Sequence, residues 1–348
     1  MNYKEFFEDK IILVCGGTGT IGTEIVSQIL DYNPKTIRIL TNSENELWES
    51  RLKFKESLNK LRFLLGDIRD YIRVNKAMED VDYVFNAAAI KHVPISEYNP
   101  LEAVNVNVLG LENIIQSALN HNVKKLVQIS TDKAISPTTV MGATKMLSER
   151  IAISRGLAKG THKTIISCVR FGNVLGSRGS IIPLIKKQIE EGNAVTLTDI
   201  NMKRFFMSID QAVKLVLKAM VLANGGEIFV LKMPTILIKD LVDIIIEEYS
   251  PKIGKDPKSI KKEIIGPRIR EKLNEVLISP QEFTSCYETE DMYIIYPDPK
   301  FDLDLALNKV QPNGSKVILD ENFHYSTDEV PLMHKKDLKN LLLKLNLI

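Results

Sequence analysis

The chain has 348 residues, of which 44% are hydrophobic, enough to bury a large core in one or two lobes. Its 46 basic and 44 acidic side chains almost cancel, so we expect neither a nucleic-acid partner nor attraction to an anionic membrane. Cys15, Cys168 and Cys286 lie far apart without a CxxC pair, which predicts no disulfide framework and no metal site. The N-terminus is polar and no apolar run reaches about 18 residues, so we expect a cytoplasmic protein without a membrane span.

Short apolar runs alternate with amphipathic segments through the first half of the chain. In order, the runs are IILVCGG, TIRIL, LRFLLG, VDYVFNAAA, VKKLVQIS and TIISCVR. Continuous apolar runs of this length are typical of buried parallel strands, and residues 21–30 and 100–120 between them have helical periodicity. This rhythm predicts an α/β fold with a Rossmann doubly wound parallel sheet. The last hundred residues lose the rhythm and predict a smaller α+β lobe.

A glycine-rich segment, GGTGTIG, joins the first predicted strand to the first long helix. Its glycines are spaced GxxGxxG, which allows a tight turn and a close approach of the backbone to a ligand. The free amides and positive dipole end of the helix that follows favour a pyrophosphate. We therefore expect this turn to bind a dinucleotide through Gly16, Thr18, Gly19, Thr20, Ile21 and Gly22.

Residues at the ends of the next strands are expected to complete the cofactor site. The second strand ends at Thr41, Asn42 and Ser43, without the acid that usually binds the ribose 2′-hydroxyl of NAD. Hydroxyl and amide donors suit a 2′-phosphate better, so we predict NADP, with NAD as the alternative. The third and fourth strands end in small or polar residues that would lie beside the adenine and the rest of the cofactor: Asp67, Ile68, Ala87, Ala88 and Ala89.

The fifth strand leads into Ser130-Thr131-Asp132-Lys133, followed by a helix that carries Met141 and Lys145. A strand-end Ser/Thr before a helical YxxxK pair is typical of the short-chain dehydrogenase/reductase superfamily in its extended form. The segments AAIKHVPISEYNPLEAVNVNVLG, STDKAISPTTVMGATK, RFGNVLGSRGSIIP and KRFFMSIDQAV together resemble the UDP-N-acetylglucosamine 4,6-dehydratases of surface-glycan synthesis. Residues 8–290 carry the resemblance. The chain departs from the superfamily in having Met141 where a tyrosine is usual. Some members of the dehydratase group also have a methionine at this position.

The same residues suit the removal of water from a hexose. Oxidation at C4 acidifies the C5 proton, after which the enzyme needs a base and an acid, and adjacent Asp132 and Lys133 supply one group of each type. Partial burial should lower the pKa of Lys133. Because the Met141 thioether cannot ionise, we expect it to fill apolar space, with Asp132 and Thr131 taking the C4-hydroxyl proton. A solvated ion pair at a strand end is the alternative interpretation of Asp132 and Lys133.

The resemblance also implies roles outside this segment. Lys145 would hold the nicotinamide ribose and Asn107 would contact the cofactor. The residues it places at the UDP-sugar are Lys91, Asn173, Ser180, Arg204, Arg268 and Glu271. It further implies a homo-oligomer, a dimer or larger. We divide the chain into an NADP-binding domain, residues 1–172 and 204–234, and a nucleotide-sugar lobe, residues 173–203 and 235–348.

The resulting prediction is a lyase, a UDP-N-acetylglucosamine 4,6-dehydratase with a tightly bound nicotinamide cofactor. Its 4-keto-6-deoxy product would serve surface glycans or nonulosonates such as pseudaminic or legionaminic acid. Two alternatives stay open: an epimerase or reductase of the same fold, and a non-catalytic protein that senses NADP, which the missing tyrosine would suit. Retention of Asp132, Lys133 and Lys145 favours catalysis.

Overall fold

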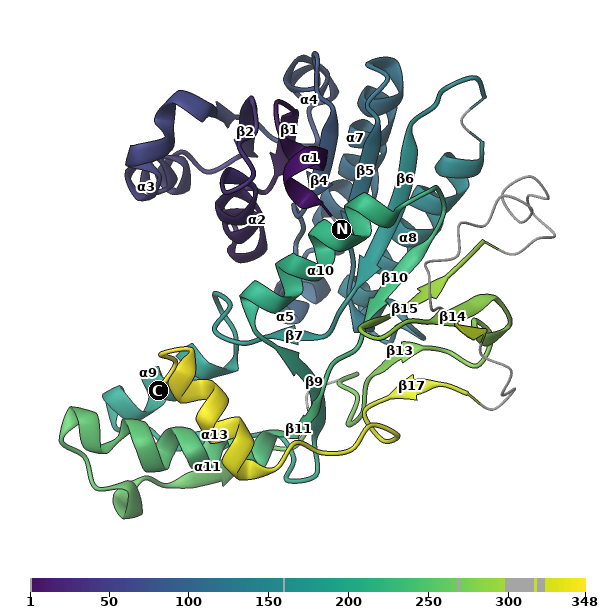
Figure 1. Cartoon of the computed structure of the whole chain (residues 1–348). Coiled ribbons are helices and arrows are strands. Elements are labelled where there is room, and N and C mark those ends of the chain that lie inside the picture. Colours follow the sequence, from purple (N-terminus) through teal and green to yellow (C-terminus); the bar gives the residue numbers. More distant parts are fainter. Residues whose placement is uncertain (1, 159, 268–269, 298–315, 318–322) are drawn as a thin grey trace.

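The apolar runs of the sequence form strands of one large sheet (Figure 1). The computed structural model describes residues 2–158, 160–267, 270–297, 316–317 and 323–348. In this part of the chain the sheet has ten strands. They are β1 (Ile11–Cys15), β2 (Thr36–Thr41), β3 (Leu61–Leu65), β4 (Tyr83–Asn86), β5 (Lys125–Ile129), β6 (Ile165–Arg170), β10 (Ile228–Leu231), β14 (Cys286–Glu288), β15 (Met292–Ile295) and β16 (Lys316–Val317).

The strand order is β16-β14-β15-β10-β6-β5-β4-β1-β2-β3. Every pairing from β3 to β10 is parallel, and the run β3-β2-β1-β4-β5-β6 is the usual Rossmann order. The order reverses between β1 and β4, so the crevice at the carboxyl ends of these strands is where a ligand is expected. The predicted doubly wound parallel sheet is confirmed.

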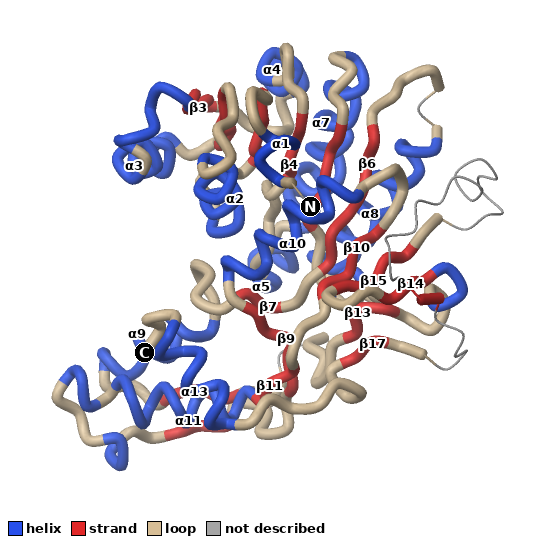
Figure 2. Tube along the Cα trace, viewed as in Figure 1, coloured by secondary structure: helices blue, strands red, loops and turns tan. Residues whose placement is uncertain are grey.

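Helices cover both faces of this sheet (Figure 2). On one side α4, α7 and α8 pack on one another, and on the other α10 packs against α2. The bounds are α1 (Tyr3–Phe7), α2 (Thr20–Leu30), α3 (Glu44–Lys53), η1 (Lys55–Lys60), α4 (Tyr71–Ala77), α5 (Val93–Tyr98), α6 (Pro100–Val104), the π-helical turn η2 (Asn105–Leu109), α7 (Gly110–Asn120), η3 (Asp132–Ala134), α8 (Val140–Leu157) and α10 (Ile209–Leu222). None of the described helices is both long and apolar enough to span a lipid bilayer.

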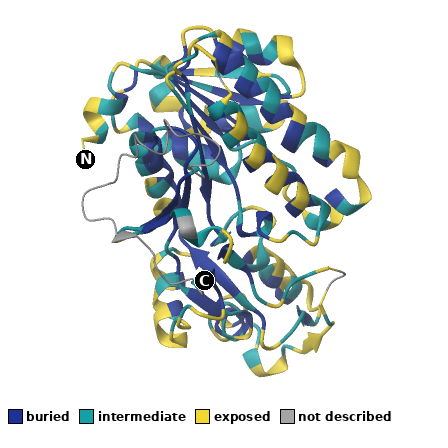
Figure 3. Cartoon of the chain, turned by 90° about the vertical axis from the view of Figure 1, so that its right-hand side faces the viewer, coloured by how far each residue is buried: buried dark blue, intermediate teal, exposed yellow. Residues whose placement is uncertain are grey.

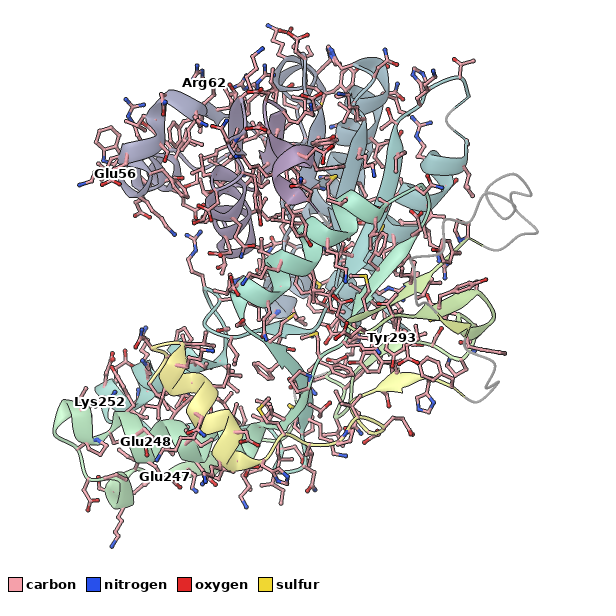
Figure 4. The ribbon with its side chains drawn as sticks, viewed as in Figure 1. Glu56, Arg62, Glu247, Glu248, Lys252 and Tyr293 are labelled. Carbon is pink, nitrogen blue, oxygen red and sulfur yellow. The ribbon has the colours of Figure 1, made fainter. Side chains whose placement is uncertain are left out.

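A smaller α+β lobe lies beyond the carboxyl ends of the sheet and has a hydrophobic core of its own. Its elements are β7 (Asn173–Val174), α9 (Ile181–Glu191), β8 (Val195–Leu197), β9 (Lys203–Met207), β11 (Thr235–Leu237), α11 (Ile238–Tyr249), η4 (Pro251–Ile253), η5 (Pro257–Ser259), β12 (Lys262–Ile264) and α13 (Lys335–Lys344). The antiparallel partners β13 (Val276–Ile278) and β17 (Tyr325–Ser326) pack into the core of the large sheet, and η6 (Phe283–Ser285) leads into β14. Figure 4 shows Glu247 and Glu248 of α11 near α13, where Lys335 and Lys339 pair with them at 2.8 and 2.6 Å.

The boundaries between the two lobes differ from those predicted from the sequence. Residues 286–295 were assigned to the small lobe, yet β15 pairs with β10 of the large sheet, antiparallel. The reason is that β15 is an apolar strand, buried throughout, and it covers the β10 edge of the parallel sheet. In the other direction, β9 lies within residues 204–234 but pairs with β7 and β11 in a separate sheet.

An ion triad joins β6, α8 and the segment before β14. The strands of the large sheet, β6 among them, are mostly buried, as the dark blue in Figure 3 shows. Arg170 is 1% exposed; its Nε and Nη2 donate to Glu149 at 2.8 and 2.7 Å, and Nη2 also donates to Glu282 at 2.7 Å. Removing one member of such a group leaves uncompensated charge in the interior. The triad therefore fixes α8 against the sheet.

Arg170→Met should lower the free energy of unfolding by about 3–5 kcal/mol, because two buried carboxylates lose their counter-ion. Urea unfolding followed by circular dichroism measures the change. The matched control is Lys214→Met, since Lys214 pairs with Asp210 on the exposed face of α10 and such pairs contribute about 0.2–1 kcal/mol. Similar losses in the two variants would contradict a structural role for the triad.

Candidate active site

The glycine turn has the geometry expected of a pyrophosphate site. Gly16 has a φ of +69°, and a Cβ there would lie 2.7 Å from the backbone nitrogen of Ala88. A Cβ on Gly22 would lie 2.2 Å from the oxygen of Gly16. Gly19 is the N-cap of α2 and, as a glycine, has no side chain to cap the amides of Thr20 and Ile21. These amides are free to bind an anion, and the backbone is bare where a phosphate would approach.

A cavity of about 340 Å³ opens beside this turn, lined among others by Thr18, Thr20, Glu46 and Arg178. Arg178 comes from the small lobe: its backbone amide donates to Thr20 Oγ1 at 3.2 Å, and its guanidinium bonds the Thr18 carbonyl and, at 2.8 Å, Glu46 Oε1. The Thr18 hydroxyl is 3.0 Å from Thr41 Oγ1 and 2.7 Å from Glu46 Oε2. The segment after β7 therefore reaches across to the turn.

At the ends of β2 and β3 the predicted residues form a polar edge. Asn42 donates to Asp67 Oδ2 at 3.1 Å, and Ser43 caps α3 by accepting from the Glu46 amide at 3.3 Å. Hydrogen bonds from Arg69 lower the pKa of Asp67, which keeps this carboxyl ionised. Ile68 is buried at this edge, against Gly110.

The segment after β4 carries Ala87, Ala88 and Ala89 along the turn. Its position is fixed by Asn107, whose Oδ1 accepts from the Ile90 amide at 2.8 Å. The Asn107 amide donates to the Ile90 carbonyl at 3.0 Å and to Thr144 Oγ1 at 2.9 Å. Asn107 thus ties this segment to α8, with its amide engaged by the protein.

The three residues after β5 form a short hydrogen-bonded chain. Asp132 is fully buried, and its Oδ1 accepts from Thr131 Oγ1 at 2.7 Å and from Lys133 Nζ at 2.9 Å. Its other oxygen, Oδ2, is buried without a hydrogen-bond partner among the described residues. The Lys133 side chain is 29% exposed. The pair is therefore neither a surface ion pair nor fully closed off.

A second carboxylate approaches Lys133 from the small lobe. Glu275 Oε1 lies 3.5 Å from Lys133 Nζ. Burial alone would lower the pKa of Lys133, but the charges of Asp132 and Glu275 outweigh it and raise that pKa above its usual value. The sequence-based expectation of a lowered pKa is wrong, because the charge of adjacent Asp132, joined by that of Glu275, outweighs burial.

Met141 and Lys145 share the buried side of α8, as their i, i+4 spacing predicts. Met141 is 4% exposed and packs in the interior. Lys145 is 7% exposed, and its Nζ donates to the Ile129 carbonyl at the end of β5 at 2.7 Å. Burial lowers the pKa of Lys145 to about 8.

A second cavity, of about 320 Å³, lies between the lobes. Five of the residues predicted to bind substrate line it: Lys91, Asn173, Ser180, Arg204 and Glu271. Asn173 Oδ1 and Ser180 Oγ are buried there without hydrogen-bond partners in the described part of the chain, so the wall offers polar groups to a ligand. The sixth, Arg268, lies outside the described residues.

Arg204 has a different geometry from that of an open phosphate receptor. Its Nη1 donates to the Leu273 carbonyl and its Nη2 to the Lys272 carbonyl, each at 2.8 Å. Glu271 Oε1 lies 3.5 Å from its guanidinium. Arg204 thus holds the segment from Glu271 to Glu275 against β9, forming one wall of the cavity.

Three residues of the site were missed by reasoning from the sequence: Glu275, Arg178 and Arg270. Arg270 lines the cavity and pairs with Glu97 at 2.9 Å. All three come from segments that fold back from the small lobe, so spatial proximity identifies them and the local sequence does not.

Comparison with known proteins places the chain among nucleotide-sugar enzymes. It is 39% identical over 331 residues, 94% of this chain and 95% of the relative, to a UDP-N-acetylglucosamine 4,6-dehydratase (inverting) of Campylobacter jejuni. It is 37% identical, with 98% of each chain covered, to a UDP-glucose 4-epimerase of Rickettsia canadensis. The solved structure of Pen from Bacillus thuringiensis has a TM-score of 0.90 and 42% identity, covering 99% of each chain.

The fold extends to more distant proteins. DesIV, the dTDP-glucose 4,6-dehydratase of Streptomyces venezuelae, solved with NAD and TYD bound, has a TM-score of 0.67 at 23% identity, covering 76% of this chain and 86% of its own. A family model described as polysaccharide biosynthesis protein matches residues 12–297, which span both halves of the cavity and the glycine turn. The predicted resemblance is therefore confirmed, and the chain belongs to the polysaccharide biosynthesis protein family.

Proposed function

We propose that the protein is a UDP-N-acetylglucosamine 4,6-dehydratase that makes a 4-keto-6-deoxy sugar nucleotide for glycan biosynthesis. The observation that carries the proposal is Lys133, which belongs to a buried ion pair with Asp132 and also lines the cavity between the lobes. Elimination across C5 and C6 requires a base for the C5 proton, and Lys133 supplies one at the carboxyl end of β5. The named dehydratase relative supports the substrate class.

A second candidate is epimerisation at C4, favoured by the relatives named UDP-glucose 4-epimerase. Epimerisation needs oxidation and re-reduction at C4 but no acid and base for C5 and C6. Proton NMR of the product from UDP-N-acetylglucosamine, with no cofactor added, separates the two. Dehydration gives a C6 methyl signal and loss of H4, whereas epimerisation keeps the C6 hydroxymethyl group. An unchanged substrate would contradict both proposals.

The residues of the turn fit a dinucleotide, because Gly16 and Gly22 allow a backbone too tightly packed for a Cβ, and uncapped Gly19 leaves the first amides of α2 to a pyrophosphate. A bound nicotinamide would accept hydride from C4 and return it to C6. We propose that Thr131 and Asp132 receive the C4-hydroxyl proton, and that Lys133 removes the C5 proton. Asn173, Ser180 and the wall held by Arg204 would orient the nucleotide-sugar and exclude water.

We expect NADP to bind more tightly than NAD, because the end of β2 presents Thr41, Asn42 and Ser43. Glu46 opposes this preference. The Thr18 hydroxyl bonds both the Glu46 carboxylate and the Thr41 hydroxyl, so the negative charge of Glu46 lies close enough to the end of β2 to repel a 2′-phosphate. Glu46→Gln should therefore strengthen NADP binding more than NAD binding. Titration of cofactor-free protein with NADP and with NAD measures the two affinities. The control is Glu56→Gln, at the outer edge of the large lobe (Figure 4). Tenfold tighter binding of NAD, about 1.4 kcal/mol, would refute the NADP preference.

A further inference from the structure

The Glu275 carboxyl has the features of a group that takes part in the reaction and not of one that only stabilises the fold. Glu275 is 3% exposed and directly precedes β13, and its backbone amide donates to Thr327 Oγ1 at 3.1 Å. Its Oε1 faces Lys133 at 3.5 Å and Arg204 Nε at 3.8 Å. Its Oε2 is buried without a hydrogen-bond partner among the described residues, an arrangement that is costly unless something else binds there.

Glu275 also differs from Asp132 in what it faces. Among the described residues, the lining of the cavity between the lobes includes Glu275 and Lys133 but not Asp132. A group that exchanges a proton with a substrate must reach it directly or through one water. Of the two carboxyls that flank Lys133, Glu275 is the one on the cavity wall.

We propose that Glu275 is the acid that protonates the departing C6 hydroxyl, and that it ends a proton chain running from Thr131 through Asp132 and Lys133. This proposal rests on the dehydratase function proposed above. The successive links of the chain are 2.7, 2.9 and 3.5 Å. Asp132, one link behind Lys133, then serves the C4 hydroxyl, and Glu275 serves C6.

The protons balance over one cycle. In the resting site Lys133 is an ammonium and Glu275 a carboxylate, and transfer of one proton between them gives an amine and a carboxylic acid. The amine takes the C5 proton as the C5–C6 double bond forms and the C6–O bond breaks, and Glu275 gives its proton to the hydroxyl, which leaves as water. When C6 is reduced, Lys133 returns its proton to C5. Asp132 then passes the C4-hydroxyl proton, received through Thr131, to Lys133.

The charges around Glu275 suit a group that gains and loses a proton. The charged groups facing it are Lys133, Asp132, Arg204 and Lys272, and those facing Lys133 are Asp132, Glu275 and Arg204. Burial raises the pKa of Glu275 despite the three cations, so its carboxylic acid is easier to reach than that of an exposed glutamate.

The test separates C4 oxidation from elimination. In cofactor-loaded Glu275→Gln, turnover of UDP-N-acetylglucosamine should fall by about a hundredfold or more, because one acid is lost. C4 oxidation should continue, so absorbance of reduced nicotinamide should build up and the bound sugar should be a 4-ketone that keeps its C6 hydroxyl, identified by mass spectrometry after quenching. Glu263→Gln, on exposed β12, is the matched control and should behave as wild type.

Turnover within a few-fold of wild type in Glu275→Gln, or equal loss of oxidation and elimination, would overturn the role of Glu275. If this variant does not retain cofactor, Glu275→Asp decides: slow elimination with normal oxidation supports the proposal, and equal slowing of both steps contradicts it. A wild-type protein that forms no dehydrated product would instead overturn the proposed function. The two failures are therefore distinguishable.

Discussion

Lys133→Gln is expected to lower the rate of dehydration by about a hundredfold or more, the usual contribution of a general acid or base. The glutamine side chain is one atom shorter and can still donate hydrogen bonds, but its amide cannot take a proton from C5. Asp132→Asn should have a similar effect, since Asp132 is buried and accepts from both Thr131 and Lys133. Turnover by purified, cofactor-loaded protein is the measurement, and exposed Lys214→Gln is the control.

Isotopic labels show which step these residues serve. In deuterated water the product should carry one deuterium at C5, because the lysine that returns the proton is 29% exposed and exchanges with solvent. Substrate deuterated at C4 should deliver its label to C6. A label that stayed at C4, or was lost to solvent, would exclude internal return of the hydride and with it the dehydratase assignment.

The sequence predicted the parts of the fold that depend on local patterns. Six apolar runs became the six strands of the Rossmann order, because a strand buried on both faces needs continuous apolar residues. GxxGxxG became a turn in which Gly16 has a positive φ and Gly22 touches its backbone, constraints that only glycine meets. Each of these features is determined by residues that lie close together in the sequence.

Features set by long-range packing were not predictable in this way. Glu275 reaches Lys133 from more than a hundred positions along the chain, so its contribution to the raised pKa of Lys133, which adds to that of adjacent Asp132, could not be inferred from the local sequence. Strand β15 joins the large sheet from the C-terminal part, which no change of composition signals. Arg178 approaches Thr18 and Glu46 in the same manner, through the return of the segment after β7.

Met141→Leu is expected to keep most of the turnover, whereas Lys145→Ala should lose about a hundredfold. Met141 is a buried apolar side chain without an ionisable proton, and leucine has a similar volume. Lys145 is a charged donor whose removal takes one of two side-chain donors from the Ile129 carbonyl and a positive charge from the proposed ribose site. The ranking of the two variants, measured as turnover per bound cofactor, is the test.

The pH dependence of turnover gives Lys145 a second, independent signature. Burial lowers its pKa to about 8, so the side chain is an ammonium below that value and a neutral amine above it. Turnover that depends on the ammonium should therefore fall as the pH rises through about 8, and Met141→Leu should keep this decline. If Met141→Leu were as inactive as Lys145→Ala while folded and loaded with cofactor, Met141 would do more than fill apolar space.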